Sequence, residues 1–272
     1  MPARVPALMS VLSPRFPHGP VLRVGGRLYA AEAVRAALAP YVSEARRARI
    51  AEVVAARTYA VLPALERMAD AGNLHAVLRS AEGLGYAAAA LVAPTREAFP
   101  LARRYAAGRG AAASAPVAEA DLGKRGGTRA AGGAHKWLDL TVWPDVDAWA
   151  EDARARGYAV VATHLGAGAV PIAEWDFTRP TALVFGNEKA GVSERLLARA
   201  DARVVLPLDG FVQSYNVSVA AALALYHARQ DRLARQGRHG DLTEAERDVL
   251  TAHYYLRSVQ AAPHLLARAL GA

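Results

Sequence analysis

Strand-like and helix-like stretches alternate along most of this 272-residue chain, and this alternation constrains the fold more than any other feature. Short apolar runs such as YAVLPAL (59–65), YAAAALVA (86–93) and TALVFG (181–186) are separated by stretches with helical periodicity. Strands joined by helices form crossover units, which place parallel strands side by side with helices on both faces. The sequence therefore predicts an α/β protein with a mostly parallel sheet.

Three segments flank or interrupt the alternation. Residues 1–42 are punctuated by Pro and Gly and are expected to form an N-terminal extension, before a main domain at 43–240. Residues 241–272 are expected to form a C-terminal helical extension, in which Thr243 and Glu246 have the spacing of a capping box. The segment 96–131 is far longer than an ordinary connection, and such segments are functional lids or disordered chain.

The charge balance favours a polyanionic partner. The chain has 33 Lys and Arg against 25 Asp and Glu, a net charge of +8, and nearly all the cations are Arg, which binds phosphate bidentately. A GC-rich genome explains the Arg-to-Lys ratio equally well, but not the excess of positive charge. In the helix predicted at 43–57, the apolar residues share one face, which leaves four arginines for phosphates: Arg46, Arg47, Arg49 and Arg57.

Several function classes are excluded or disfavoured. The absence of Cys excludes disulfides, cysteine-ligated zinc and a thiol nucleophile. The sequence has no uncharged apolar run of about 18 residues, and the N-terminus lacks the apolar core of a secretory signal, so we expect a cytoplasmic location. There is also no Walker motif, no G-x-S-x-G elbow and no His pair at metal-binding spacing, so no metal site is expected.

Two stretches, GLGYAA (83–88) and GRGAAA (108–113), mimic a dinucleotide fingerprint. A true fingerprint follows a strand and opens a helix, so that backbone amides point at the pyrophosphate. The first stretch instead closes a helix and opens a strand, and the second lies in the long segment. Gly83 and Gly85 are therefore interpreted as helix-stop glycines.

Polar residues recur where strands end, and the densest group is Gln213 to Asn216, between an apolar run and a long helix. One Asn or Ser would suffice as a helix N-cap, so the surplus suggests a ligand. Similar polar stretches follow the strands that end near Thr163 and Gly186. Because ligands bind beyond the carboxyl ends of parallel strands, these stretches predict a pocket at one edge of the sheet.

Three of these stretches, in this order and spacing, resemble the signature motifs of the SpoU/TrmH family of RNA 2′-O-ribose methyltransferases, within the SPOUT superfamily: NLHAVLRSAEGLG, TALVFGNEKAGVSERLLARAD and LPLDGFVQSYNVSVAAALALYHARQ. The resemblance runs from about Ser43 to Arg235, and ARRARIAEVVAAR, ATHL and VQSYNVSVAAALALY point to the tRNA enzymes that methylate the D-loop guanosine. Two departures are Ala71-Gly72, where Pro-His is usual, and the long 96–131 segment.

The resemblance implies a deep C-terminal trefoil knot, a homodimer formed through the knots, and S-adenosylmethionine as the methyl donor. In this family the donor is held by backbone groups of three loops, which here implies cofactor-binding positions at Thr163, Leu165, Gly186, Asn187, Leu206, Leu208 and Tyr215. A donor bound in this way needs no glycine fingerprint.

The same resemblance implies a set of catalytic residues: Asn73, Arg79, Glu188, Ser214 and Asn216. Without the motifs, Arg79 would be interpreted as a solvent-exposed charge on a helix and Asn216 as a helix N-cap. Glu188 would be interpreted as forming an ion pair with Lys189 or Arg195. In the motifs, Glu188 is expected to hold Asn73, while Arg79 activates the ribose hydroxyl. Because a guanidinium is almost never neutral, we expect Arg79 to stabilise the developing alkoxide rather than act as a free base.

Two other functions stay open at this point. A ribosomal-RNA ribose methyltransferase would share every catalytic residue, but residues 1–42 look too short for the separate RNA-binding domain that such enzymes usually carry. A catalytically silent RNA-binding module would keep the basic surface and lose Arg79 or Asn216, both of which are present.

Overall fold

The computed structural model describes residues 12–95, 115–116 and 133–271, which form two compact units. One unit combines the chain up to Ala56 with Leu242–Ala272, and the other is Arg57–Asp241. The predicted division after residue 42 is therefore wrong, because helix α2 belongs with the C-terminal segment rather than with the sheet. The predicted C-terminal boundary at residue 241 lies one residue from the observed one.

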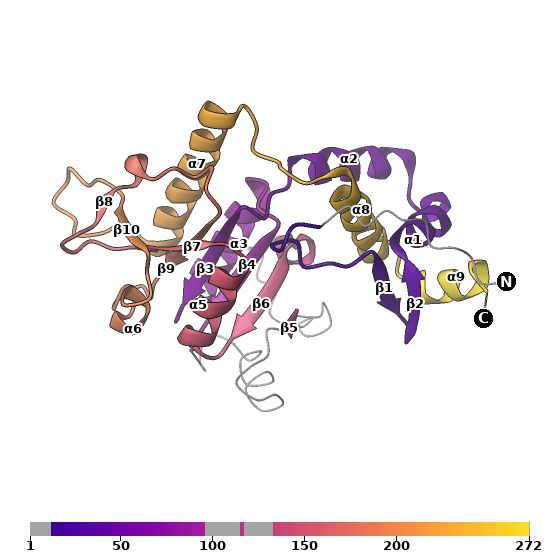
Figure 1. Ribbon diagram of the computed structural model, residues 1–272, viewed down its shortest axis with the longest axis horizontal. Coiled ribbons are helices and arrows are strands. Elements are labelled where there is room, and N and C mark those ends of the chain that lie inside the picture. The colour runs from indigo at the N-terminus through magenta and orange to yellow at the C-terminus, as the bar shows by residue number, and fades with distance from the viewer. Residues whose placement is uncertain (1–11, 96–114, 117–132, 272) are drawn as a thin grey trace. The chain divides into compact units, whose positions relative to one another are not determined.

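The Arg57–Asp241 unit is built on an eight-stranded sheet in the order β5-β6-β4-β3-β9-β7-β10-β8 (Figure 1). All its neighbouring strands are parallel except the pair β5 and β6. The strands are β3 (Val61–Glu66), β4 (Ala88–Val92), β5 (Ala115–Pro116), β6 (Asp139–Trp143), β7 (Ala159–Thr163), β8 (Val170–Pro171), β9 (Thr181–Phe185) and β10 (Ala202–Val205). The predicted α/β class with a mostly parallel sheet is confirmed.

Both faces of this sheet are buried, which is why β3, β4 and β9 read as continuous apolar runs. On one face α3 (Ala71–Gly83) and α7 (Val217–Gln236) pack against each other and against the strands. The helix α5 (Val146–Ala155) packs on β6 and β7 and contacts the short α6 (Glu194–Leu197). The described part of this unit also contains two short 3₁₀ helices, at Ala134–Trp137 and Ile172–Glu174.

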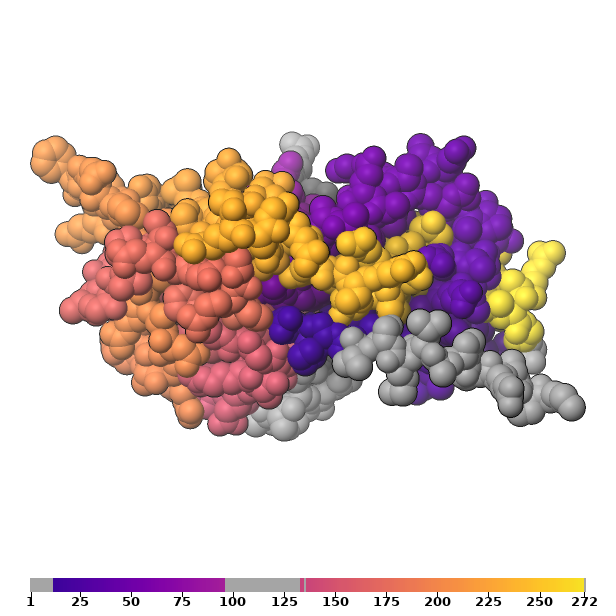
Figure 2. Space-filling model, turned by 45° about the horizontal axis from the view of Figure 1, so that its top comes forward, coloured from indigo at the N-terminus to yellow at the C-terminus, as the bar shows by residue number. Residues whose placement is uncertain are grey.

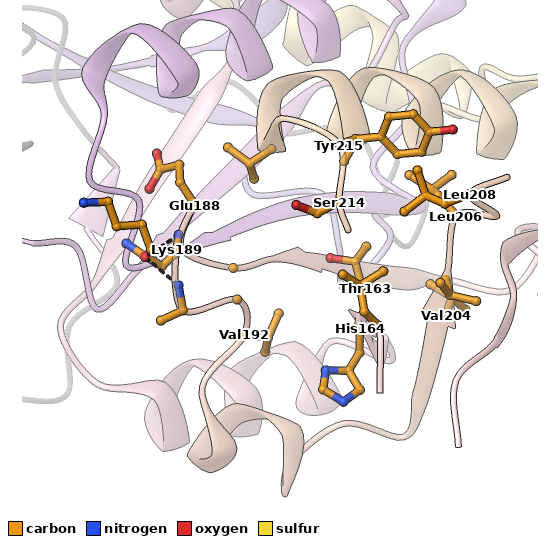
Figure 3. A pocket seen from close by; sticks show the side chains of 18 residues that line it. Thr163, His164, Glu188, Lys189, Val192, Val204, Leu206, Leu208, Ser214 and Tyr215 are labelled. Atoms are coloured by element: carbon orange, nitrogen blue, oxygen red, sulfur yellow. Dashed lines mark hydrogen bonds between the residues drawn. The ribbon is translucent and has the colours of Figure 1, made fainter. Parts of the chain in front are cut away.

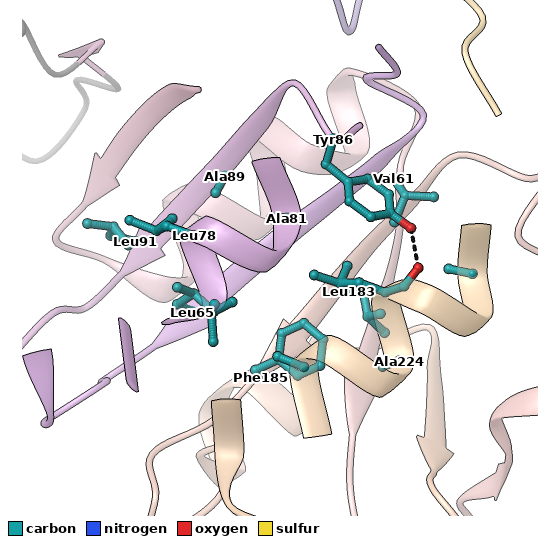
Figure 4. Close-up of a cluster of buried hydrophobic side chains, with 14 of the residues drawn as sticks. Val61, Leu65, Leu78, Ala81, Tyr86, Ala89, Leu91, Leu183, Phe185 and Ala224 are labelled. Atoms are coloured by element: carbon teal, nitrogen blue, oxygen red, sulfur yellow. Dashed lines mark hydrogen bonds between the residues drawn. The ribbon is translucent and has the colours of Figure 1, made fainter. Parts of the chain in front are cut away.

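The core of this unit lies between the sheet and the α3–α7 pair, as Figure 4 shows. Leu65, Leu183 and Phe185 from the strands meet Leu78 from α3 there. Tyr86 is fully buried beside them, and its hydroxyl donates to the carbonyl oxygen of Leu225 over 2.6 Å, which joins the end of α3 to α7. Burial raises the pKa of Tyr86, so this hydroxyl stays protonated and keeps donating.

Helix α3, which carries the first motif, begins and ends at defined caps. Asp70 is its N-cap, where the carboxylate accepts from the amide of Asn73 over 2.6 Å. At the other end Gly85 adopts a φ of +94°, and the amides of Gly85 and Tyr86 donate back to the carbonyls of Glu82 and Ala81. This is a Schellman motif, so the prediction is confirmed for Gly85, while Gly83 is the last residue of the helix.

The other unit contains a β-hairpin of β1 (Val21–Val24) and β2 (Arg27–Ala30), followed by α1 (Ala31–Leu38) and a 3₁₀ turn at Ala39–Tyr41. Helices α2 (Glu44–Ala56), α8 (Glu244–Ser258) and α9 (Ala262–Ala269) complete it, and both α1 and α2 pack against α8. The predicted capping box of Thr243 and Glu246 is present at the start of α8. The carboxylate of Glu246 also accepts from the amide of Ser13, which attaches the N-terminal segment to α8.

In the parts of the chain that the structure describes, no helix is both long and apolar enough to cross a membrane.

Candidate active site

A cavity of about 340 Å³ opens at the carboxyl edge of the parallel sheet (Figure 3). Its walls are the loops that follow β7, β9 and β10, together with the first turn of α7. Glu188 and Lys189 lie at one end, whereas Leu206, Leu208 and Tyr215 lie at the other. The predicted pocket at the ends of the strands is therefore present, with a charged end and an apolar end.

The loop after β9 is the most tightly built wall of the cavity. Asn187 and Gly191 exchange two backbone hydrogen bonds of 2.9 Å, and the side-chain oxygen of Asn187 accepts from the amides of Lys189 and Ala190. Gly191 has a φ of +68°, and a Cβ placed on Gly186 would lie 2.1 Å from backbone atoms of Gly191 and Val192. Only glycine at position 186 lets the turn fold back this closely.

Glu188 ties this loop to the start of α3. Its carboxylate accepts from the amides of Ala69 and Asp70 over 3.2 and 3.0 Å, and the side-chain amide of Asn73 donates to it over 3.4 Å. Burial acts to raise the pKa of Glu188, but the backbone hydrogen bonds outweigh it, so its pKa lies below the ordinary value. Arg195 instead pairs with Asp145 and Asp147, so the alternative pairing of Glu188 with Arg195 is not found.

Two further contacts fix the same loop against the end of β3. The side-chain amide of Asn187 donates to the carbonyl of Arg67 over 2.9 Å. Glu66, which is fully buried, accepts from the amide of Ser193 over 2.8 Å and also from its hydroxyl. Ser193 in turn caps α6, so the loop is anchored at both of its ends.

The structure gathers most of the predicted site residues around the cavity. All seven predicted cofactor-binding residues line it, as do two of the predicted catalytic residues: Thr163, Leu165, Gly186, Asn187, Leu206, Leu208 and Tyr215, with Glu188 and Ser214. The other three do not line it. Asn73 is linked to it through Glu188, Arg79 is exposed on α3, and Asn216 is the N-cap of α7.

The side chain of Asn216 caps the N-terminus of α7, which is the structural alternative considered for it above. Its carbonyl oxygen accepts from the amide of Ser218 over 2.9 Å and from the hydroxyl of the same residue over 2.6 Å. Because Val217 and Ala220 of the same helix line the cavity, the cap also fixes this wall. A structural role is thus shown for Asn216, and its catalytic role stays a prediction.

The prediction that Arg57 binds RNA is wrong. Helix α2 ends at Ala56, and the Arg57 side chain is only 1% exposed. Its guanidinium donates to the carbonyls of Glu82 and Tyr86 and pairs with the Glu82 carboxylate at 2.6 Å, so it holds the C-terminal end of α3. Arg46 and Arg49 are exposed on α2, while Arg47 is half-buried and donates to the carbonyl of Ala39.

Sequence reasoning assigned no binding or catalytic role to Lys189 or His164, although both line the cavity. The position of Lys189 directly after Glu188, within the second motif, was the available signal for it. For His164 the signals were its place at the end of a strand and its presence in ATHL (162–165).

Comparison with known proteins identifies the family. Residues 117–226 match the profile of the SpoU rRNA Methylase family. The tRNA (guanosine(18)-2′-O)-methyltransferase of Thermus thermophilus is 38% identical over 191 residues, which cover 70% of this chain and 85% of that protein. This chain belongs to the SpoU methylase family.

Solved structures of SpoU methylases have the same fold. The TrmH/SpoU tRNA-modifying enzyme of A. aeolicus superposes with a TM-score of 0.61 at 26% identity, covering 79% of this chain and 98% of that one. An AdoMet-bound rRNA methyltransferase from Sinorhizobium meliloti has a TM-score of 0.50 at 28% identity, covering 62% of this chain and 56% of that one. The predicted resemblance to this family is therefore confirmed.

Proposed function

We propose that this SpoU methylase transfers a methyl group from S-adenosylmethionine to a ribose 2′-hydroxyl of tRNA, at the D-loop guanosine. The observation that carries the proposal is the cavity at the carboxyl edge of the sheet, which all seven implied donor-binding residues line. The tRNA substrate rests on the Thermus thermophilus relative, of which this chain covers 85%.

The residues of the cavity suit this donor. The cavity volume of about 340 Å³ lies in the range of small-molecule sites. Val204, Leu206 and Leu208 supply apolar surface for an adenine ring, and the loops bring backbone amides and carbonyls to the same space. When bound, the donor supplies an electrophilic methyl group on a positively charged sulfur. The S. meliloti structure, which has AdoMet bound, supports the choice of donor.

The nucleophile is a ribose hydroxyl, which is weak until its proton is removed or its developing charge is stabilised. We assign this stabilisation to Arg79, whose guanidinium offers several N–H donors to a developing alkoxide. Glu188 holds the start of α3 through Ala69, Asp70 and Asn73, so it positions the helix that carries Arg79. Ser214, at the cavity wall, is assigned to orienting the ribose.

A trefoil knot is the chain path that we propose for the C-terminal half of this unit. In the sheet, β9 lies between β3 and β7, whereas β10 lies on the other side of β7, and α7 returns to pack on α3. The chain therefore crosses β7 in one direction between β9 and β10 and returns in the other before α7. Residues from the segment 206–216 and from the loop 186–192 line the same cavity. The two opposed crossings support a path in which the segment 206–216 passes through the connection that contains the loop 186–192.

A homodimer is the assembly that we propose, with α7 in its interface. Val219, Leu223 and Tyr226 are 46%, 43% and 53% exposed, and their spacing puts them on one face of this helix. Phe211 and Val212, in the segment between β10 and α7, are also highly exposed. Figure 2 shows an orange segment that projects from this unit. Exposed apolar side chains on one face of a helix are typical of a protein contact. Replacing Leu223 by Glu should give a folded monomer in analytical ultracentrifugation, and a monomeric wild type would contradict the proposal.

The experiment that tests the proposed function uses labelled donor with unmodified tRNA and, separately, with ribosomal RNA. Methylation of tRNA, mapped to the D-loop guanosine, is the expected result. Methylation of ribosomal RNA alone would favour the second candidate, which the rRNA enzyme among the structural relatives supports. RNA binding without transfer to either substrate would favour the catalytically silent module. The cytoplasmic location stays a prediction.

A further inference from the structure

Two cationic residues next to the cavity are joined through one side chain, that of Asn187. Its side-chain oxygen accepts from the amide of Lys189, and its side-chain nitrogen donates to the carbonyl of Arg67. The two cations come from different loops, which follow β3 and β9 and are 122 positions apart in the chain, yet a single amide fixes both of their backbones. Their side chains therefore start from rigidly held positions at the same edge of the sheet.

Among the described residues that line the cavity, Lys189 is the only Lys or Arg. The neighbouring Glu188 carboxylate already accepts two backbone amides and the Asn73 amide, and no ion pair joins it to Lys189. Within the described parts of the chain, the ammonium group of Lys189 contacts no carboxylate at ion-pair distance. It lies with Glu188 at the charged end of the cavity, away from the apolar end formed by Leu206 and Leu208 (Figure 3).

Arg67 has an unusual backbone conformation for its residue type. Its φ is +52°, which strains a residue with a long side chain and which glycine adopts freely. The conformation lets its amide donate to the carbonyl of Val92 while its carbonyl meets Asn187. Its side chain is exposed, and no hydrogen bond or ion pair to its guanidinium occurs among the described residues. The backbone would suit glycine better, so what arginine adds at this position is its charge.

We propose that Arg67 and Lys189 bind backbone phosphate of the RNA next to the nucleotide whose ribose enters the cavity. This inference rests on the proposed function, because it names the contacts that place that substrate. A ribose hydroxyl within the cavity brings its flanking phosphates to the rim, where each would meet an unpaired cation. The phosphate contacts fix the position of the RNA and carry no sequence information of their own.

The test compares single and double variants in binding and kinetics. Arg67→Gly removes the guanidinium and suits the backbone, and Lys189→Gln removes the ammonium. Each should raise the Kd for unmodified tRNA roughly three- to tenfold. Each should also flatten the slope of log K against log salt by about 0.7 to 0.9. The affinity for S-adenosylmethionine, measured by calorimetry without RNA, should stay unchanged.

Two matched variants control for other effects. Among the described residues, Ala93 is the other non-glycine residue with a positive φ, at +43°. Ala93→Gly does not alter charge, so its tRNA affinity and salt slope should match those of the wild type. Lys189→Arg keeps a cation and should retain most of the tRNA affinity. If Ala93→Gly weakens tRNA binding as much as Arg67→Gly does, the effect comes from the backbone and the inference is wrong.

The remaining outcomes separate this inference from the proposed function. Unchanged tRNA affinity and salt slope in the double variant, with an active wild type, would overturn the inference alone. Loss of donor affinity with unchanged tRNA affinity would overturn it too, because the cations would then serve the carboxylate of the donor. A wild type that binds tRNA through these residues but methylates no RNA would overturn the proposed function and leave the phosphate contacts standing.

Discussion

Replacing Gly186 by Ala should destroy the donor site while leaving most of the fold intact. A Cβ at this position would lie 2.1 Å from the Gly191 carbonyl carbon and the Val192 nitrogen, and 2.4 Å from the Gly191 oxygen, whereas ordinary contacts begin near 3.4 Å. All three atoms belong to backbone, so no side-chain rotation relieves the clash. The turn at Asn187–Gly191 must move by more than about 1 Å, and overpacking of this kind costs roughly 1–3 kcal/mol.

The expected loss of function exceeds the loss of stability, because the moved turn carries Asn187 and Glu188, which join the cavity to β3 and α3. For a unit of this size, each kcal/mol lowers Tm by roughly 2–4 °C. Calorimetric titration with S-adenosylmethionine should show binding weakened at least about tenfold, while differential scanning calorimetry still shows a cooperative transition.

Gly83→Ala is the matched control. Gly83 is the last residue of α3, and a Cβ there meets nothing within 4 Å. Alanine is the better helix former, so this variant should be neutral or slightly more stable and should bind the donor normally. The reasoning is refuted if Gly186→Ala binds the donor with wild-type affinity and shows an unchanged Tm.

Three further predictions concern single side chains. Arg79→Ala should lower the single-turnover rate at saturating donor by about 10²–10³, with donor affinity unchanged and little rescue by Arg79→Lys; near wild-type turnover would contradict the assigned role. Glu188 has a lowered pKa, so the stability that it contributes is present above its unfolded pKa and is lost as pH falls through its folded pKa. The free energies of unfolding of the wild type and Glu188→Gln should therefore approach each other as the pH falls. If the difference between them does not shrink, the charge of Glu188 does not contribute to stability. Arg57→Ala leaves Glu82 without its partner and frees two carbonyls at the end of α3, which should cost roughly 3 kcal/mol or more; a variant with wild-type stability and weakened RNA binding would restore Arg57 to the RNA-binding set.

The sequence predicted the parts of the site that depend on local pattern. Buried strands appear as apolar runs, and polar residues after them must meet at one edge when the strands are parallel. The stretches near Thr163, near Gly186 and at Gln213 to Asn216 were predicted to meet in this way, and residues of all three line the cavity. Caps are also local, and Gly85 and the box of Thr243 and Glu246 were found where they were predicted.

Contacts between distant segments could not be predicted in this way. Helical periodicity placed Arg57 on the polar side of a helix that in fact ends one residue earlier, and its burial depends on carbonyls 25 and 29 positions away. The domain boundary failed for the same reason, since α2 packs on α8 from the opposite end of the chain. Lys189 and Arg67 were missed because only the fold shows that Asn187 contacts both.

The most direct test of the central claim is the position of the methyl group. Purified protein, labelled S-adenosylmethionine and unmodified tRNA are incubated together, and the ribose-methylated nucleotide is located by nuclease digestion and mass spectrometry. The account predicts one 2′-O-methylguanosine in the D-loop of wild-type reactions and none with Arg79→Ala. A methyl group on a base, or no transfer to tRNA or ribosomal RNA by protein that binds the donor, would contradict it.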